Sequence, residues 1–94
     1  MFYSNYQTDV LEEVTTKEAL AEEKQLVLYN DDVNTFDHVI ETLITVCEHN
    51  ALQAEQCAMI VHYNGKCTVK TAALKKIKPM CSALLDAGLS AEIQ

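Results

Sequence analysis

The sequence has few of the residues that interrupt regular structure. Its 94 residues include two glycines, one proline and no tryptophan. Together with an apolar content of 49%, this is typical of an ordinary globular domain rather than a disordered chain. A chain of this length has room for one domain and buries only about 60% of its unfolded surface. We therefore expect one compact core.

Long apolar runs are also absent. No stretch approaches the roughly 18 residues that a helix needs to cross a bilayer. The segment from Met1 to Asn5 has no basic start followed by an apolar stretch, so no secretory signal is visible. We expect a cytoplasmic protein without a membrane partner. Nothing in the pattern suggests more than a monomer.

Basic residues are scarce. Seven basic and fourteen acidic side chains give a formal charge of −7. Such a surface repels phosphate backbones, and no basic stripe with interleaved aromatics is present. Nucleic acid is thereby excluded as an expected partner, and a cationic group or a basic protein patch is favoured.

The four cysteines lack the spacing of a metal site. Cys47, Cys57, Cys67 and Cys81 form no C-x-x-C pair, whereas zinc sites usually contain closely spaced ligands. Their apolar neighbours favour reduced thiols that fill the core. The sequence also lacks a nucleophile with a nearby base, a glycine-rich phosphate loop and an H-x-x-x-H pair. We therefore expect no enzyme, no metal and no cofactor.

Charge patterning divides the chain into residues 1–24 and residues 25–94. The first segment has no sustained apolar face, which predicts a flexible acidic extension, with a packed helix over residues 16–24 as the alternative. Its acidic residues are Asp9, Glu12, Glu13, Glu18, Glu22 and Glu23. The second segment is expected to form the core domain.

The core begins with a short strand and a helix. Residues 25–29 (QLVLY) are rich in strand-forming side chains and end at a polar Asn-Asp-Asp loop. From Phe36 to Cys47 the apolar residues follow helical spacing, and either Asn34 or Thr35 can act as the N-cap.

Two more helices and two more strands are expected after residue 48. Asn50 and Gln53 have the spacing of a capping box for a helix that ends at Gly65. A strand over residues 66–69 precedes a helix that Thr71 can cap, which runs to about residue 87 and is kinked or split by Pro79. Gly88 then leads into a strand over residues 89–93. The order β-α-α-β-α-β predicts an α+β two-layer sandwich, with three short antiparallel strands packed against three helices.

One constellation suggests binding chemistry. Asn30 and Asp32 stand between the first strand and the first helix, and His62 stands near the end of the second helix. A carboxylate, an amide oxygen and an unprotonated imidazole nitrogen are all acceptors, and a protonated amine offers three donors. A charge-assisted bond to Asp32 contributes roughly 1.5–3 kcal/mol. The alternative is an acidic loop that merely caps a helix; His38 and His49 are interpreted as surface or interface histidines.

Two motifs resemble the ClpS family of protease adaptors. LVLYNDDVNTFDHVIETL is similar to the family's strand, N-D-D loop and first helix, and AMIVHYNGK resembles its M-x-x-V-H-x-x-G-K segment. The resemblance runs from about Leu26 to Ile93. It implies an adaptor that delivers N-degron substrates, whose first residue is Leu, Phe, Tyr or Trp, to a ClpA- or ClpC-type AAA+ unfoldase for degradation by ClpP.

The resemblance also implies roles for individual residues. Asn30, Asp32 and His62 match the residues that bind the substrate α-amino group. The extension before residue 25 matches the part that engages the unfoldase, and Lys78 matches a contact to its N-terminal domain. The positions at or near the pocket for the first side chain are Leu28, Asn34, Phe36, Val39, Ala58, Val61 and Leu89.

Several positions depart from the family pattern. Asn34 replaces the usual Thr, and Phe36 and Ala58 replace Met residues, which changes the expected shape of the pocket. Ala73 stands where the family has an acidic unfoldase contact, and Pro79 is unusual. If the Phe36 ring fills the pocket, the chain is instead a docking module that modulates the unfoldase without binding degrons. A small enzyme using His62 and Asp32 is the remaining alternative.

Overall fold

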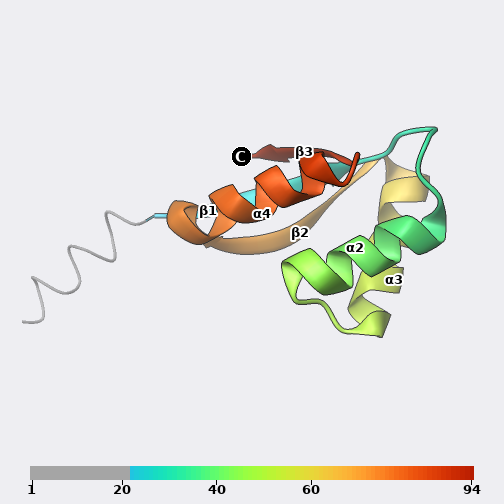
Figure 1. Cartoon of the computed structure of the whole chain (residues 1–94), viewed down its shortest axis with the longest axis horizontal. Helices are drawn as coiled ribbons and strands as arrows, with labels where there is room; N and C mark the ends of the chain where they lie inside the picture. The colour runs from blue at the N-terminus through green and yellow to red at the C-terminus, as the bar shows by residue number, and fades with distance from the viewer. Residues whose placement is uncertain (1–21) are drawn as a thin grey trace, which may run out of the picture.

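The computed structural model describes residues 22–94, which form three helices and a three-stranded sheet (Figure 1). The predicted order β-α-α-β-α-β and the α+β sandwich are confirmed. The expected extension over residues 1–24 falls mainly outside the described residues, as does the alternative helix over 16–24, although Glu23 and Lys24 are strand. The elements are β1 (Glu23–Tyr29), α2 (Phe36–Cys47), α3 (Ala51–Asn64), β2 (Lys66–Ala73), α4 (Leu74–Asp86) and β3 (Ser90–Ile93).

The sheet has the order β2-β1-β3, and β1 pairs antiparallel with both neighbours. Figure 1 shows α4 lying along the sheet, with α2 and α3 packed together beside it. In the central strand three successive residues, Leu26, Val27 and Leu28, are buried. An irregularity in the β1–β2 register falls between Leu26 and Val27.

The core lies between the sheet and the three helices. In α4 the buried side chains Ile77, Met80, Cys81 and Leu84 recur at the spacing of one helix face. Burying each large apolar side chain contributes roughly 1.5–3 kcal/mol. The largest fully buried side chains are Leu26, Leu28, Leu43, Ile77, Leu84 and Cys47.

Local capping explains where α2 and α3 begin. Of the two candidates for the first cap, Thr35 takes the role, since its Oγ1 accepts from the His38 amide at 3.1 Å. The predicted capping box of α3 is confirmed by reciprocal bonds between Asn50 and Gln53 of 2.8 and 3.0 Å. Glu48 ends α2 in the left-handed region, with φ of 64°, and its carboxylate lies 3.0 Å from the Lys70 ammonium.

Four predicted boundaries are wrong. β1 begins at Glu23, two residues before the predicted start, and β2 ends at Ala73 rather than at residue 69. Both strands are longer because residues 23–25 pair with residues 71–73. Thr71 is therefore a strand residue and not a cap; α4 starts at Leu74 without a side-chain cap. The last strand begins at Ser90, one residue late, since the turn at Gly88 has to be completed first.

Pro79 lies inside α4, which continues from Leu74 to Asp86, so the proline does not split the helix. A proline at an interior position removes one backbone hydrogen bond and crowds the preceding turn, at a cost of about 3 kcal/mol.

We expect Pro79→Ala to raise the free energy of unfolding by about 1–3 kcal/mol, because the regained hydrogen bond outweighs the ~0.4–1 kcal/mol that proline contributes through the unfolded state. Urea unfolding measures the change. Ser82→Ala, at an exposed site on the same helix, is the control and should stay within about 0.5 kcal/mol. A less stable Pro79→Ala variant would contradict the prediction and mean that packing of α4 requires the proline.

The four cysteines are free thiols. Cys47 and Cys81 are buried as predicted, whereas Cys57 and Cys67 are only partly buried. Burial raises the pKa of Cys47 to about 11 and also raises the pKa values of Cys57 and Cys81. These three thiols are therefore protonated at neutral pH and are poor nucleophiles.

Candidate functional site

A cavity of about 370 Å³ opens where the end of β1, the following loop, α2, α3 and the α4–β3 turn meet. Every residue predicted for the amine site or the pocket lines this cavity, whereas Lys78 lies elsewhere, exposed on α4. The lining residues are Leu28, Tyr29, Asn30, Asp31, Asp32, Asn34, Phe36, Val39, Ala58, Val61, His62 and Leu89.

A glycine turn brings Asn30 close to His62. Gly65 ends α3 with φ of +94°, a conformation that L side chains rarely adopt, and its amide donates to the Val61 carbonyl at 2.9 Å. The Gly65 carbonyl in turn accepts from the Asn30 amide, also at 2.9 Å. The start of the loop is thereby fixed to the end of the helix that carries His62.

Asp31 organises the loop. Its Oδ1 accepts from the amides of Val33 and Asn34, both at 2.9 Å, and its Oδ2 accepts from the Asn34 side chain at 2.9 Å. The bond from the Asn34 amide is the main cause that lowers the pKa of Asp31, so this carboxylate stays ionised at neutral pH. Asp31 is therefore occupied within the loop.

The neighbouring acceptors are free. Asn30, Asp32 and His62 are exposed, and their side chains make no hydrogen bond to any other residue in the described range 22–94. One amide oxygen, one carboxylate and one imidazole thus border the same cavity with their acceptor atoms available.

The rest of the cavity wall is largely apolar. Ala58 and Val61 are buried and lie next to His62 on one face of α3, and Leu28 and Val39 come from β1 and α2. The Phe36 ring stands edge-on to the His62 ring, with centroids 5.9 Å apart, and remains 40% exposed. Phe36 therefore borders the cavity and leaves it open.

The end of α4 places Leu89 in the wall. The Leu89 amide donates to the Leu84 carbonyl at 3.0 Å, and the Gly88 amide donates to the Leu85 carbonyl at 2.9 Å. With Gly88 at φ of +87°, these are the two bonds of a Schellman motif. Leu89 follows the turn at once and is 4% exposed, against Leu84 in the core.

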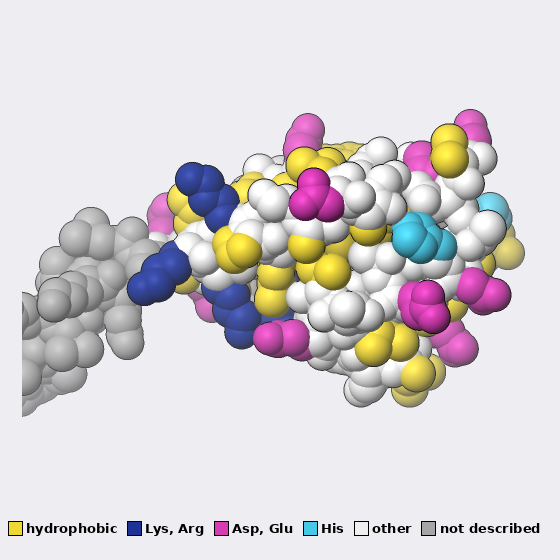
Figure 2. Space-filling view, in the orientation of Figure 1, with side chains coloured by type: hydrophobic (Ala, Val, Ile, Leu, Met, Phe, Trp, Pro, Cys, Tyr) yellow, Lys and Arg dark blue, Asp and Glu magenta, His cyan; other side chains and the backbone are white. Residues whose placement is uncertain are grey.

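Charge is unevenly distributed over the surface. Figure 2 shows lysines gathered at the end where β1 and α4 begin, while the visible histidines lie toward the opposite end.

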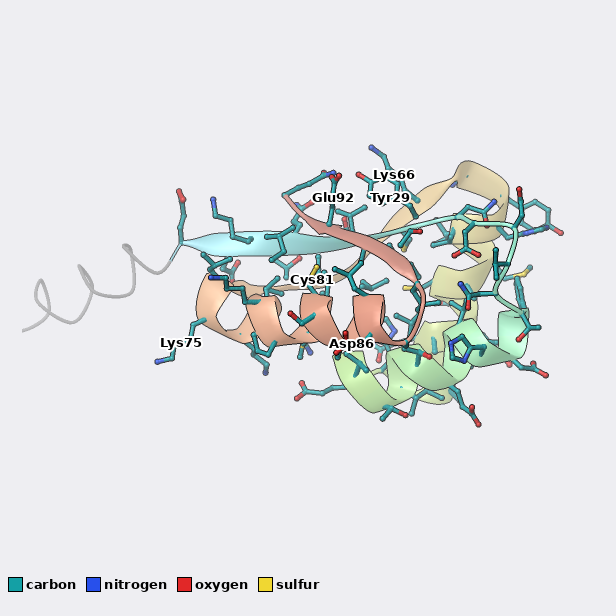
Figure 3. All side chains as sticks on the ribbon, turned by 45° about the horizontal axis from the view of Figure 1, so that its top comes forward. Tyr29, Lys66, Lys75, Cys81, Asp86 and Glu92 are labelled. Carbon is teal, nitrogen blue, oxygen red and sulfur yellow. The ribbon has the colours of Figure 1, made fainter. Side chains whose placement is uncertain are left out.

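Figure 3 places Lys75 and Asp86 at the two ends of α4, and Tyr29 beside Glu92 of β3. The Tyr29 hydroxyl donates to Glu92 at 3.4 Å, a long and exposed hydrogen bond, and backbone pairing of Tyr29 with Ser90 joins this end of β1 to β3.

Comparison with known proteins assigns the chain. Residues 19–92 match the family described as "ATP-dependent Clp protease adaptor protein ClpS". The chain belongs to the ClpS family. It is 34% identical over 83 residues to the ClpS adapter protein of Synechococcus elongatus, covering 87% of each chain. A ClpS adapter of Campylobacter jejuni is 38% identical over 63 residues, which are 63% of this chain and 66% of that one.

A solved structure shares the ClpS fold. Agrobacterium tumefaciens ClpS2 bound to L-phenylalaninamide superposes with a TM-score of 0.65, covering 77% of this chain and 94% of that one at 20% identity. The family consists of Clp protease adaptors, not catalysts. Among residues 22–94 there is no grouping of three possible metal ligands, and no helix long and apolar enough to span a bilayer.

Sequence reasoning missed Tyr29 and Asp31 as cavity residues. Tyr29 is simply the last residue of the predicted strand. Asp31 carried a usable signal, because an Asp side chain commonly bonds backbone amides two and three residues ahead and so closes a turn. That pattern was visible in Asp31-Asp32-Val33-Asn34.

Proposed function

We propose that this ClpS-family chain binds the free amino terminus of N-degron proteins and delivers them to a ClpA- or ClpC-type AAA+ unfoldase for degradation by ClpP. The observation that carries the proposal is the set of three free acceptors, Asn30, Asp32 and His62, at the border of an open apolar cavity. No cofactor is needed for this function.

The acceptors suit an α-ammonium group. Such a group has three N–H donors, which Asp32, the Asn30 side-chain oxygen and an unprotonated His62 ring nitrogen accept. The bond to Asp32 is charge-assisted and is the strongest of the three. An internal peptide segment has no α-ammonium group on its backbone, and the ammonium of an internal lysine stands at the end of a long side chain, so the site is suited to chain ends.

The cavity suits a bulky apolar first side chain. The apolar wall consists of Leu28, Val39, Val61 and Leu89, and the small side chain of Ala58 lies in the same lining. The ClpS2 structure, of the same fold, contains L-phenylalaninamide, a free amine joined to a phenylalanine side chain. We therefore infer a preference for Leu, Phe, Tyr or Trp as the first residue.

The docking-only alternative requires the Phe36 ring to fill the pocket. The ring instead borders an open cavity, which supports peptide binding. For the unfoldase contact we propose residues 1–24 and Lys78, with the adaptor acting as a monomer. Ala73 is half-buried at the start of α4, where an acidic contact would be needed for the family's full docking pattern.

Peptide binding tests the proposal. We expect labelled peptides that begin with Leu, Phe, Tyr or Trp to bind in fluorescence anisotropy. N-acetylation should weaken each by at least about tenfold, because it removes the charge and leaves acceptors unpaired. An Ala-first peptide is the control for the side-chain pocket. Equal binding of free and acetylated peptides, or no binding by the folded protein, would contradict the proposed function.

A further inference from the structure

The α4–β3 turn is held by two side chains from outside it. His38, on α2, bonds the Ala87 carbonyl through Nε2 at 2.8 Å. Asn34, on the loop after β1, donates through Nδ2 to the Gly88 carbonyl at 2.8 Å. A carbonyl oxygen only accepts, so the proton of the His38 ring is on Nε2. We call these two bonds the turn clasp.

The clasp acts on backbone carbonyls of the turn that α4 leaves unpaired, whereas the amides of Gly88 and Leu89 are already bonded to α4. The carbonyls of Ala87 and Gly88 lie beyond the last turn of α4 and accept no bond from within the helix. Asn34 is itself held by Asp31, which accepts from both its backbone amide and its side chain. The turn is therefore tied to an ordered loop and to α2.

The α4–β3 turn positions one wall of the cavity. Leu89 comes directly after Gly88 and lines the cavity, whereas His38 is not among the lining residues. Of the amine-site residues, Asn30 is tied to the other glycine turn, because its backbone amide donates to the Gly65 carbonyl. The clasp thus adjoins the side-chain pocket. Its His38 bond comes from α2, whereas its Asn34 bond comes from the loop that also carries Asn30 and Asp32.

We propose that His38, together with Asn34, is a positioning residue that sets the fit of the pocket for bulky first side chains by holding Leu89 in place. The inference rests on the proposed function and adds a specificity role for a side chain that touches no ligand. Without the clasp the turn has more freedom, and binding has to order it. The entropy cost of ordering the turn lowers the affinity of those ligands whose first side chain contacts Leu89.

His38→Ala isolates this role because it leaves the cavity lining and the amine site unchanged. We expect the affinity for a Phe-first peptide to fall about three- to tenfold, the range for one neutral hydrogen bond. The affinity for an Ala-first peptide, measured by competition, should stay within about twofold. His38→Gln, which keeps a donor on a side chain of similar reach, should restore most of the Phe-first affinity.

Two further measurements separate positioning from general damage. Amide hydrogen exchange should accelerate at Gly88 and Leu89 in His38→Ala, with little change at Gly65. Glu41→Ala, one turn further along α2 at an exposed site, is the matched control and should leave both affinities unchanged.

The outcomes are distinct. A wild-type protein that binds no peptide overturns the proposed function and this inference together. If the wild type binds, an unchanged Phe-to-Ala affinity ratio in His38→Ala overturns the inference alone. So does a His38→Gln variant that stays as weak as His38→Ala, since the hydrogen bond would then not be what matters.

Discussion

Asp32→Asn is expected to weaken binding of a Phe-first peptide by roughly 10- to 100-fold, because a charge-assisted hydrogen bond contributes about 1.5–3 kcal/mol. The substitution keeps the size of the side chain and removes its charge. Asp32 is exposed and bonds no other residue within 22–94, so the free energy of unfolding should change by less than about 0.5 kcal/mol. Anisotropy titration and urea unfolding measure the two quantities.

Asp37→Asn is the matched control. Asp37 is also an exposed aspartate, in the first turn of α2, but it does not line the cavity. Its replacement makes the net charge less negative by the same amount as Asp32→Asn. Affinity should nevertheless remain within about twofold at 0.15 M salt, where distant exposed charges are screened. Equal losses in the two variants would mean that the peptide is attracted by net charge, and the amine site would be refuted.

Leu84→Ala is expected to lower the free energy of unfolding by about 2–5 kcal/mol, from lost apolar burial and from the cavity that remains. Leu84 is 0% exposed and belongs to the core cluster. The total free energy of unfolding of a domain of this size is only about 5–15 kcal/mol, so the variant will lose much of its stability. Urea unfolding at 25 °C is the measurement.

The next residue offers a close control. Leu85 is 52% exposed on the same helix, and Leu85→Ala removes the same atoms while alanine favours the helix. We expect a change below about 1 kcal/mol there. If Leu85→Ala lowered the free energy of unfolding as much as Leu84→Ala, α4 would have to face the core with a different side from the one described.

The sequence predicted those parts of the fold whose signals are local. The capping box of Asn50 and Gln53 and the stop at Gly65 lie within a few residues of the boundaries they set. The end of β2 was predicted too early, since it depends on pairing with residues 23–25, far away along the chain. Thr71 has a side chain suited to an N-cap, but its backbone pairs with β1 in the sheet, so the residue belongs to β2.

The residues of the candidate site follow from the family resemblance. The side-chain bonds that hold the surrounding turns in place do not follow from it. Asn34 was weighed as a helix cap, whereas its side chain bonds Asp31 and Gly88. His38 was interpreted as a surface or interface histidine, and its partner at Ala87 is 49 residues away. The bonds to Gly88 and Ala87 depend on how distant elements pack, which no local pattern encodes, whereas the bond of Asn34 to Asp31 is local.

The two glycine turns lie at different places on the border of the cavity. One anchors the loop that carries Asn30, which we propose binds a free chain end, and the other carries Leu89, which we propose forms a wall of the pocket for the first side chain. If the proposed function holds, we expect substitutions around Gly88 to change which first residues bind while the requirement for a free amine persists. A protease adaptor built this way can acquire a new range of substrates without beginning to bind intact chain interiors.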